Sequence, residues 1–270
     1  FPDLYDIGMS HMGTKILYKL VNEMTRATAE RVFAPWADME GELRGRELPL
    51  VSLETATPLK DFDVVGFSLQ YELTFTNVLN MLDLGGIPVR NEDRDLDTPL
   101  IIAGGPVATH PEPIAPFIDV FLIGDAEEKL PELLTRWHQI KQVKGLSRLD
   151  RIRELVKIGA LYAPSLYQRE EDERTGLFAV VPPEKGAAPY PVQRAILDDL
   201  NKFPFPDDSP EPVAEAIFDR MSMEIARGCT EGCRFCQAGM IYRPVREREP
   251  EAIVDTLVSA IEKGGYDEAS

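Results

Sequence analysis

Apolar runs alternate with helical patterns through the first half of the chain. The runs lie at 64–67, 100–103 and 119–123, a weaker one at 49–53, and the helical patterns at about 14–30, 74–84 and 127–141. Short runs that are nearly continuous in apolar residues, separated by helices, are typical of a parallel sheet covered on both faces. The pattern predicts an α/β fold with a doubly wound parallel sheet domain at 1–141. We also expect the chain to start at Phe1 inside or just after a first strand.

Each predicted strand ends in a turn rich in glycine or serine. These turns contain Gly8 and Ser10, Gly66 and Ser68, Gly104 and Gly105, and Gly124. Open α/β sheets bind ligands at the carboxyl ends of their strands, and glycine there lets a large flat or phosphorylated ligand approach the backbone. Tight turns without a ligand are the alternative interpretation, because a fold does not define a function.

Prolines set residues 142–215 apart as a connector. A short helix is predicted at 149–158 and a strand at 177–181, and the proline density after them is typical of a stiff linker. The pair Asp207 and Asp208 is expected to form a solvated turn.

Residues 216–270 combine a predicted strand, a loop and a predicted helix. Met221, Met223 and Ile225 alternate with polar or small residues, which predicts a half-buried strand. Apolar residues at helical spacing predict a helix at 250–263, with a proline in its first turn. Strand, loop and helix form the first unit of a βα barrel, whose sites lie at the carboxyl ends of strands.

The loop of this unit, RGCTEGCRFCQAG, carries every cysteine of the chain. Cys229, Cys233 and Cys236 follow the spacing Cys-x3-Cys-x2-Cys. Thiolates are soft ligands that favour iron–sulfur clusters, zinc or copper(I). Three thiolates can hold three irons of a [4Fe-4S] cluster and leave the fourth iron open for a substrate or cofactor.

Two other interpretations of the cysteines remain open. A disulfide suits the odd count and the tight spacing poorly. Structural zinc takes four ligands, and the fourth would have to be His11, His110 or His138, which are distant in sequence.

The cysteine spacing, with the aromatic Phe235 just before the third cysteine, resembles the radical S-adenosylmethionine (SAM) superfamily. The resemblance implies that Cys229, Cys233 and Cys236 bind the cluster, that Phe235 contacts SAM, and that a 5′-deoxyadenosyl radical is formed. It also implies an electron donor such as flavodoxin or ferredoxin. Arg227 and Arg234 either offset the negative cluster or are ordinary solvated arginines.

The turns of the first domain resemble the flavodoxin-like cobalamin-binding domain that precedes many radical SAM domains. That family carries Asp-x-His-x-x-Gly, then Ser-x-Leu, then Gly-Gly. The match is partial, because Gly8 stands at the Asp position, Ser10 at the cobalt-ligating His position and Gln70 at the Leu position. Direct histidine ligation of cobalt is therefore not expected. The resemblance implies a cobalamin site lined by Gly8, Ser10, Gly13, Ser68, Gly104, Gly105 and Gly124.

A further resemblance lies at the end of this domain. The segment from Gly124 is similar to a Gly-Glu-x-Glu turn of the same branch, with Asp125 and Glu127 at the acidic places. Acidic residues here also suit the amino end of a helix. The whole resemblance implies a radical SAM enzyme, with methyl transfer through cobalamin as one outcome, of which this chain is a fragment.

The composition limits the classes of function that the chain can have. The chain has 270 residues, 44% hydrophobic and 28% charged, with 29 basic and 46 acidic residues and a net charge of −17. An acidic balance argues against broad binding of phosphate backbones. No apolar stretch approaches a membrane span, no signal peptide is visible, and clustered reduced cysteines favour the cytoplasm. Two rival functions stay open: a front domain without cobalamin that docks a protein or RNA substrate, and a non-catalytic ligand sensor with structural zinc.

Overall fold

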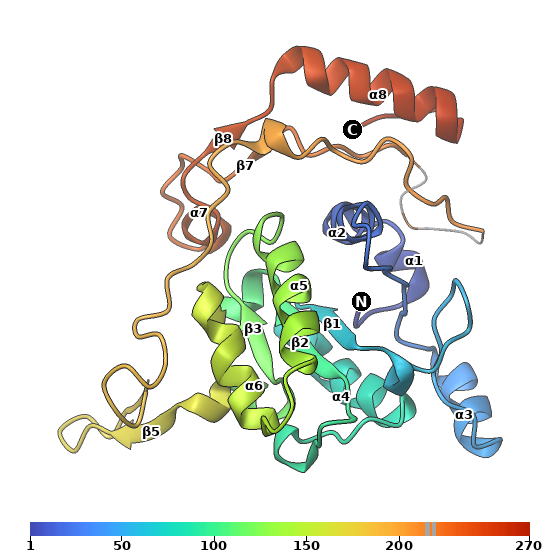
Figure 1. The fold of residues 1–270 in the computed structure, drawn as a ribbon. Helices are drawn as coiled ribbons and strands as arrows, with labels where there is room; N and C mark the ends of the chain where they lie inside the picture. Colours follow the sequence, from blue (N-terminus) through green and yellow to red (C-terminus); the bar gives the residue numbers. More distant parts are fainter. Residues whose placement is uncertain (214–216, 218–219) are drawn as a thin grey trace.

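The structure is a computed structural model that describes residues 1–213, 217 and 220–270 (Figure 1). The predicted boundary between connector and barrel unit, at 215–216, falls outside the described residues.

A four-stranded sheet occupies the first part of the chain. Its strands are β1 (Val64–Ser68), β2 (Leu100–Gly104), β3 (Val120–Leu122) and β4 (Leu161–Tyr162), in the order β1-β2-β3-β4. The first three are parallel, with Val64 opposite Leu100 and Ile102 opposite Val120, and β4 is antiparallel to β3. The three predicted strands are confirmed, whereas β4 comes from beyond the predicted domain end at 141 and extends the same sheet.

Helices cover both faces of this sheet, as the apolar runs predicted. On one face, Ile101 and Ala103 pack in a core that includes α4 (Phe75–Leu84). On the other face, Leu100 and Ile102 pack in a second core with α5 (Lys129–Lys141) and α6 (Arg148–Leu155). Neighbouring residues of a strand point to opposite faces, so burial of both faces requires an unbroken apolar run.

The opening segment is helical: Phe1 leads into α1 (Tyr5–Gly8), and the next helix is α2 (Met12–Asn22). The chain therefore does not start inside a strand, and a start just after a strand stays a prediction. The prediction that α2 reaches residue 30 was wrong, because the Asn22 side chain accepts a hydrogen bond from the Ala29 amide and donates one to its carbonyl. The chain is thereby folded back on itself directly after the helix.

The segment that follows holds α3 (Ala37–Gly45), which was not predicted. The predicted strand at 49–53 is reduced to a single bridge between Val51 and Pro58. Turns of 3-10 helix lie at Leu59–Asp61, Glu72–Thr74, Asn91–Asp93, Pro106–Thr109, Ala115–Phe117, Val156–Ile158, Pro164–Leu166 and Leu200–Lys202.

The connector keeps both of its predicted elements. Helix α6 and the 3-10 turn after it cover the predicted helix at 149–158, and β6 (Phe178–Val181) is the predicted strand. Its partner β5 (Gln168–Glu171) is polar and exposed, which left no apolar signal in the sequence.

The last part contains β7 (Ala226–Arg227), α7 (Ala238–Ile241), β8 (Arg246–Glu247) and α8 (Pro250–Gly264). Helix α8 confirms the predicted helix and is followed by Gly265, whose φ is +69°. The predicted half-buried strand is not regular along its length: Met221 and Met223 are buried, but Ile225 is 60% exposed.

Residues 221–223 nevertheless pair with the end of the chain. The Met223 amide donates to the Ser270 carbonyl at 3.0 Å, the Ser270 amide donates to Met221 at 2.8 Å, and Met221 bridges Ala269 in parallel. The path from Met221 through the cysteine-bearing loop and α8 to residue 270 thus returns to lie parallel to its start, as consecutive strands of a βα unit do.

Asp207 joins this last part to α2, so the prediction of a solvated turn was wrong for Asp207, whereas Asp208 is exposed. Its carboxylate accepts hydrogen bonds from Lys263 and Ser259 of α8, and Lys19 of α2 lies 3.3 Å away. Lys19 also binds Asp208 at 2.8 Å. The hydrogen bonds from Lys263 and Ser259 hold the pKa of Asp207 well below its usual range.

We predict that Asp207→Asn lowers the melting temperature near neutral pH and that this deficit shrinks in acid. A carboxylate whose pKa is lowered by folding contributes stability above its unfolded pKa of about 3.9, and the contribution is lost as pH falls through the folded pKa. Melting curves of wild type and variant from pH 7 to pH 3, followed by circular dichroism, measure the deficit. A deficit that stays constant across this range would contradict the assigned ion pairs.

Candidate functional site

The loop between β7 and β8, residues 228–245, carries the cysteines and is called the cysteine loop below. Its two ends meet, because Ala226 pairs with Glu247 and Arg227 pairs with Arg246. Gly228 has a φ of +98°, and a Cβ there would lie 2.7 Å from the carbonyl oxygens of Tyr242 and Pro244. A residue with a side chain would push the two ends apart, so glycine is required at this position.

The three thiols lie on the cysteine loop without disulfides. Cys229 and Cys236 are partly exposed and Cys233 is exposed. Among the described residues, no group of three or more His, Cys, Asp and Glu side chains is placed to hold a metal ion, so the loop brings the thiols close in sequence without assembling them as ligands. The donor set still suits a cluster, because three accessible thiols on one short loop are soft ligands.

The aromatic and basic neighbours of the cysteines differ in their surroundings. Phe235 is 92% exposed and Arg234 is exposed, so neither is held in a core. Contact of Phe235 with SAM stays a prediction. Arg227, by contrast, is mostly enclosed.

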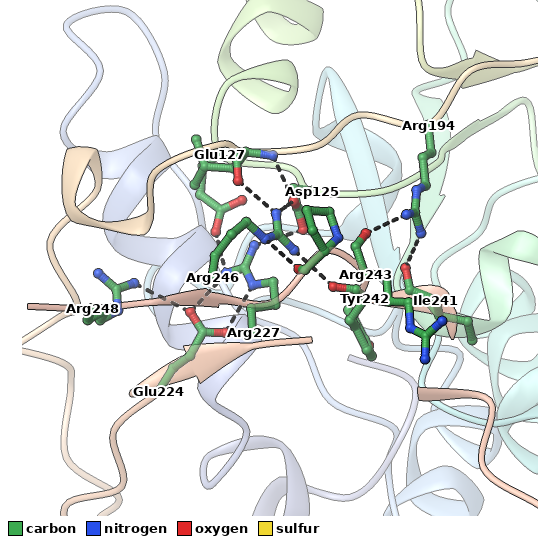
Figure 2. Close-up of polar contacts among 12 residues, drawn as sticks. Asp125, Glu127, Arg194, Glu224, Arg227, Ile241, Tyr242, Arg243, Arg246 and Arg248 are labelled. Carbon is green, nitrogen blue, oxygen red and sulfur yellow. Dashed lines mark hydrogen bonds and ion pairs between the residues drawn. The ribbon is translucent and has the colours of Figure 1, made fainter. Parts of the chain in front are cut away.

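Arg227 is the centre of a set of charged contacts between the cysteine loop and the sheet (Figure 2). Its guanidinium lies 2.9 Å from Asp125 and 2.6 Å from Glu127, both in the turn after β3, and 2.9 Å from Glu224. Only 12% of the Arg227 side chain is exposed. Burial by itself lowers the pKa of Arg227, but hydrogen bonds to Glu127 and Glu224 outweigh it and raise the pKa.

The exit of the cysteine loop is held in a similar way. Arg246 binds Asp125 and donates to the carbonyl of Leu197 at 2.7 Å. Arg248 donates to the carbonyl of Leu200 at 2.8 Å and lies 3.4 Å from Glu224. We call Arg227, Arg246 and Arg248 with Asp125, Glu127 and Glu224 the arginine–carboxylate network (Figure 2).

Asp125 is shared by both ends of the loop. It also accepts a hydrogen bond from the Leu197 amide at 2.8 Å. Burial raises the pKa of Asp125, but the Leu197 amide and the guanidinium of Arg246 outweigh it and hold the pKa below its ordinary value. Asp125 is therefore an ionised carboxylate that ties both strands at the base of the loop to the sheet.

Sequence reasoning did not find this network. Arg227 was expected either to offset a cluster or to be solvated, and its partners Asp125 and Glu127 are about 100 residues away. The local signals were the spacing of Glu224 and Arg227, three residues apart, and the alternation of Arg246 and Arg248 beside β7. Neither signal identifies the long-range partner.

A cavity of about 930 Å³ runs along β1 from Asp63 to the carboxyl ends of β1 and β2 and reaches the start of the cysteine loop. Of the predicted cobalamin-site residues, it is lined by Gly13, Ser68, Gly104, Gly105 and Gly124, together with Arg227 and Gly228. The other two do not line it. A Cβ at Gly8 would lie 2.1 Å from the Phe33 ring, and the Ser10 hydroxyl donates to the Asp6 carbonyl. The structure thus brings together most, but not all, of the predicted set.

Two of these glycines are required by the fold itself. Gly105, with φ +101°, faces the Leu69 carbonyl oxygen, which would lie 2.6 Å from a Cβ. Gly124, with φ +103°, faces the Ala195 carbonyl oxygen at 2.1 Å on the same measure. Gly104 has more room, with the nearest atom at 3.6 Å. The protein's own backbone therefore lies where a ligand was expected to approach Gly105 and Gly124.

Comparison with known proteins now identifies the class. Residues 13–164, more than half of the chain, match the family described as radical SAM proteins, N-terminal, and the chain belongs to this family. The match covers the four-stranded sheet and ends before the cysteine loop.

A curated relative extends the similarity. The uncharacterised protein MJ0966 of Methanocaldococcus jannaschii is 26% identical over 213 residues, which are 78% of this chain and 37% of that protein. The chain thus spans well under half the length of this relative. None of the described helices is long and apolar enough to cross a membrane.

Proposed function

We propose that this chain is the front part of a radical SAM enzyme in which Cys229, Cys233 and Cys236 hold a [4Fe-4S] cluster. The observation that carries the proposal is a loop with three accessible, unpaired thiols at the spacing that suits such a cluster, in a chain of the radical SAM N-terminal family. When bound, the cluster would supply an open iron for SAM and the electron that generates a 5′-deoxyadenosyl radical.

The chain's own residues would prepare that site. The three thiols would lose their protons and bind iron, and Gly228 keeps the two ends of the loop in contact. Phe235, exposed beside the third cysteine, offers a flat apolar face for the adenine of SAM. The arginine–carboxylate network holds both ends of the loop against the sheet.

We further propose a division into a cobalamin-binding-like domain at 1–141, a connector at 142–215 and the first unit of a radical SAM barrel at 216–270, with β4 packed on the first part. The parallel pairing of residues 221–223 with the end of the chain supports the barrel unit. A cytoplasmic location and an electron donor such as flavodoxin or ferredoxin belong to the same proposal.

Cobalamin is the finer proposal for the first domain, with methyl transfer or another radical modification as the outcome. It is supported by the 930 Å³ cavity, which is lined by Gly13, Ser68 and Gly104 and also by the start of the cysteine loop. A specific observation favours a second candidate, a cobalamin-free docking module: Gly105 and Gly124 already face the protein's own carbonyls.

Anaerobic reconstitution of the full-length protein with iron and sulfide tests the main proposal. We expect about four irons and four sulfides per chain, and a reduced paramagnetic signal that SAM perturbs. Bound zinc with a fourth protein ligand, and no iron uptake, would instead support the ligand sensor. Addition of cobalamin to the same sample separates the two candidates for the first domain, because a retained corrin absorbance supports cobalamin and its loss supports the docking module.

A further inference from the structure

We propose that the turn formed by Asp125 and Glu127 positions the cysteine loop through Arg227, so that the sheet domain sets the geometry of the site. This inference rests on the proposed function of the loop. Arg227 is a positioning residue in it, because it acts on the cysteines through the backbone.

Arg227 lies very close to the first cysteine in the chain. One residue, Gly228, separates it from Cys229, and Gly228 packs against the carbonyls of Tyr242 and Pro244. A displacement of Arg227 is therefore transmitted to the first cysteine without a flexible segment between them.

The turn formed by Asp125 and Glu127 is rigid. The Asp125 amide donates to the Ala195 carbonyl at 3.0 Å, and Gly124 bridges Ala195 in parallel. The Glu127 side chain is only 5% exposed, in the turn between β3 and α5. The carboxylates that receive Arg227 are thus fixed to the sheet.

The charges of the network favour a positioning role for Arg227 over compensation of the cluster's negative charge. Arg227, Arg246 and Arg248 face Asp125, Glu127 and Glu224, three cations against three anions. The charge of Arg227 is already neutralised by its partners, so little of it is left to offset a negative cluster. The planar fork of arginine binds carboxylates in a fixed geometry, which a lysine cannot reproduce although it keeps the charge.

The test uses the full-length protein with Arg227→Lys, Glu127→Gln and the matched control Glu132→Gln. Glu132 lies on α5, the helix that follows the Asp125–Glu127 turn, in an exposed pair with Lys129 at 2.8 Å and outside the network. Two readouts are taken: hydrogen exchange of the amides around 226–230 in the metal-free protein, and the SAM dissociation constant with the paramagnetic spectrum after reconstitution. Melting curves show that each variant is folded.

We expect faster exchange at 226–230 in Arg227→Lys and Glu127→Gln, and SAM binding weakened about 10- to 100-fold, the usual effect of losing a group that orients metal ligands. Glu132→Gln should match wild type in both readouts. Normal SAM binding in Arg227→Lys would show that only the charge matters and would overturn the proposal.

The exchange readout separates this inference from the proposed function. A wild type that takes up no cluster, with faster exchange in the two network variants, would leave the positioning role intact and remove the proposed chemistry. Unchanged exchange in both variants would overturn the positioning role whether or not the cluster forms.

Discussion

Replacement of Cys233 by serine is expected to reduce iron uptake from about four irons per chain to less than one. Three thiolates bind three of the four irons and leave one iron open. The loss of any one thiolate therefore removes one of the three anchors of the cluster. Serine preserves the size of the side chain, but its hydroxyl is a hard donor that stays protonated and does not bind iron as a thiolate does. Iron and sulfide analysis after anaerobic reconstitution measures the loss, and Cys229→Ser and Cys236→Ser should give the same result.

The control for this prediction lies in the same loop. Thr230 is exposed between Cys229 and Cys233, and Thr230→Ala should retain wild-type iron content. If a variant with Cys229, Cys233 and Cys236 all replaced by serine still binds four irons, the assignment of the cysteines is wrong. If the wild type takes up zinc and the substitution of one histidine, such as His11, abolishes that uptake, the result would point to the structural zinc site instead.

The predictability of this fold depends on how far each signal extends along the chain. Strands β1 to β3 were predictable because their apolar residues pack on both faces of the sheet, fully in β2 and β3 and partly in β1, so their apolar runs are nearly continuous. Strand β4 has only two residues and lies within a segment of turns, so the sequence there shows no periodic apolar pattern. The end of α2 is set by the hydrogen bonds of Asn22 with Ala29, and such a local competition with the helix backbone overrides the apolar period.

The candidate site was less predictable than the fold, because most of its contacts join residues that are far apart in the sequence. The cysteine spacing is local, so the sequence could indicate the three thiols as candidate metal ligands, but it could not indicate which carboxylates enclose Arg227. Gly105 and Gly124 were expected to let a ligand approach the backbone, and the structure shows the protein's own Leu69 and Ala195 carbonyls close to them. A glycine pattern reports a close approach without naming the atom that approaches.

The second large effect is expected inside the sheet domain, where Asp119→Asn should lower the free energy of unfolding by about 3–5 kcal/mol. Asp119 is 2% exposed and accepts hydrogen bonds from the Ile101 amide at 2.8 Å and from Arg148 at 2.7 Å. Its other oxygen lies 3.2 Å from the guanidinium of Arg94, whose side chain is fully buried. Burial lowers the pKa of Arg94 and Asp119 opposes it, so removal of the carboxylate charge leaves a buried cation without compensation.

Urea unfolding of wild type and variant measures this cost, with Asp63→Asn as the matched control. The Asp63 side chain is 80% exposed in its pair with Lys141, so its loss should cost less than about 1 kcal/mol. The double variant Asp119→Asn with Arg94→Met should recover part of the loss, because the stranded charge is gone and an apolar chain fills its place. A cost for Asp119→Asn no greater than that for Asp63→Asn would mean that water reaches Arg94, and the buried pair would then contribute no more than a surface contact.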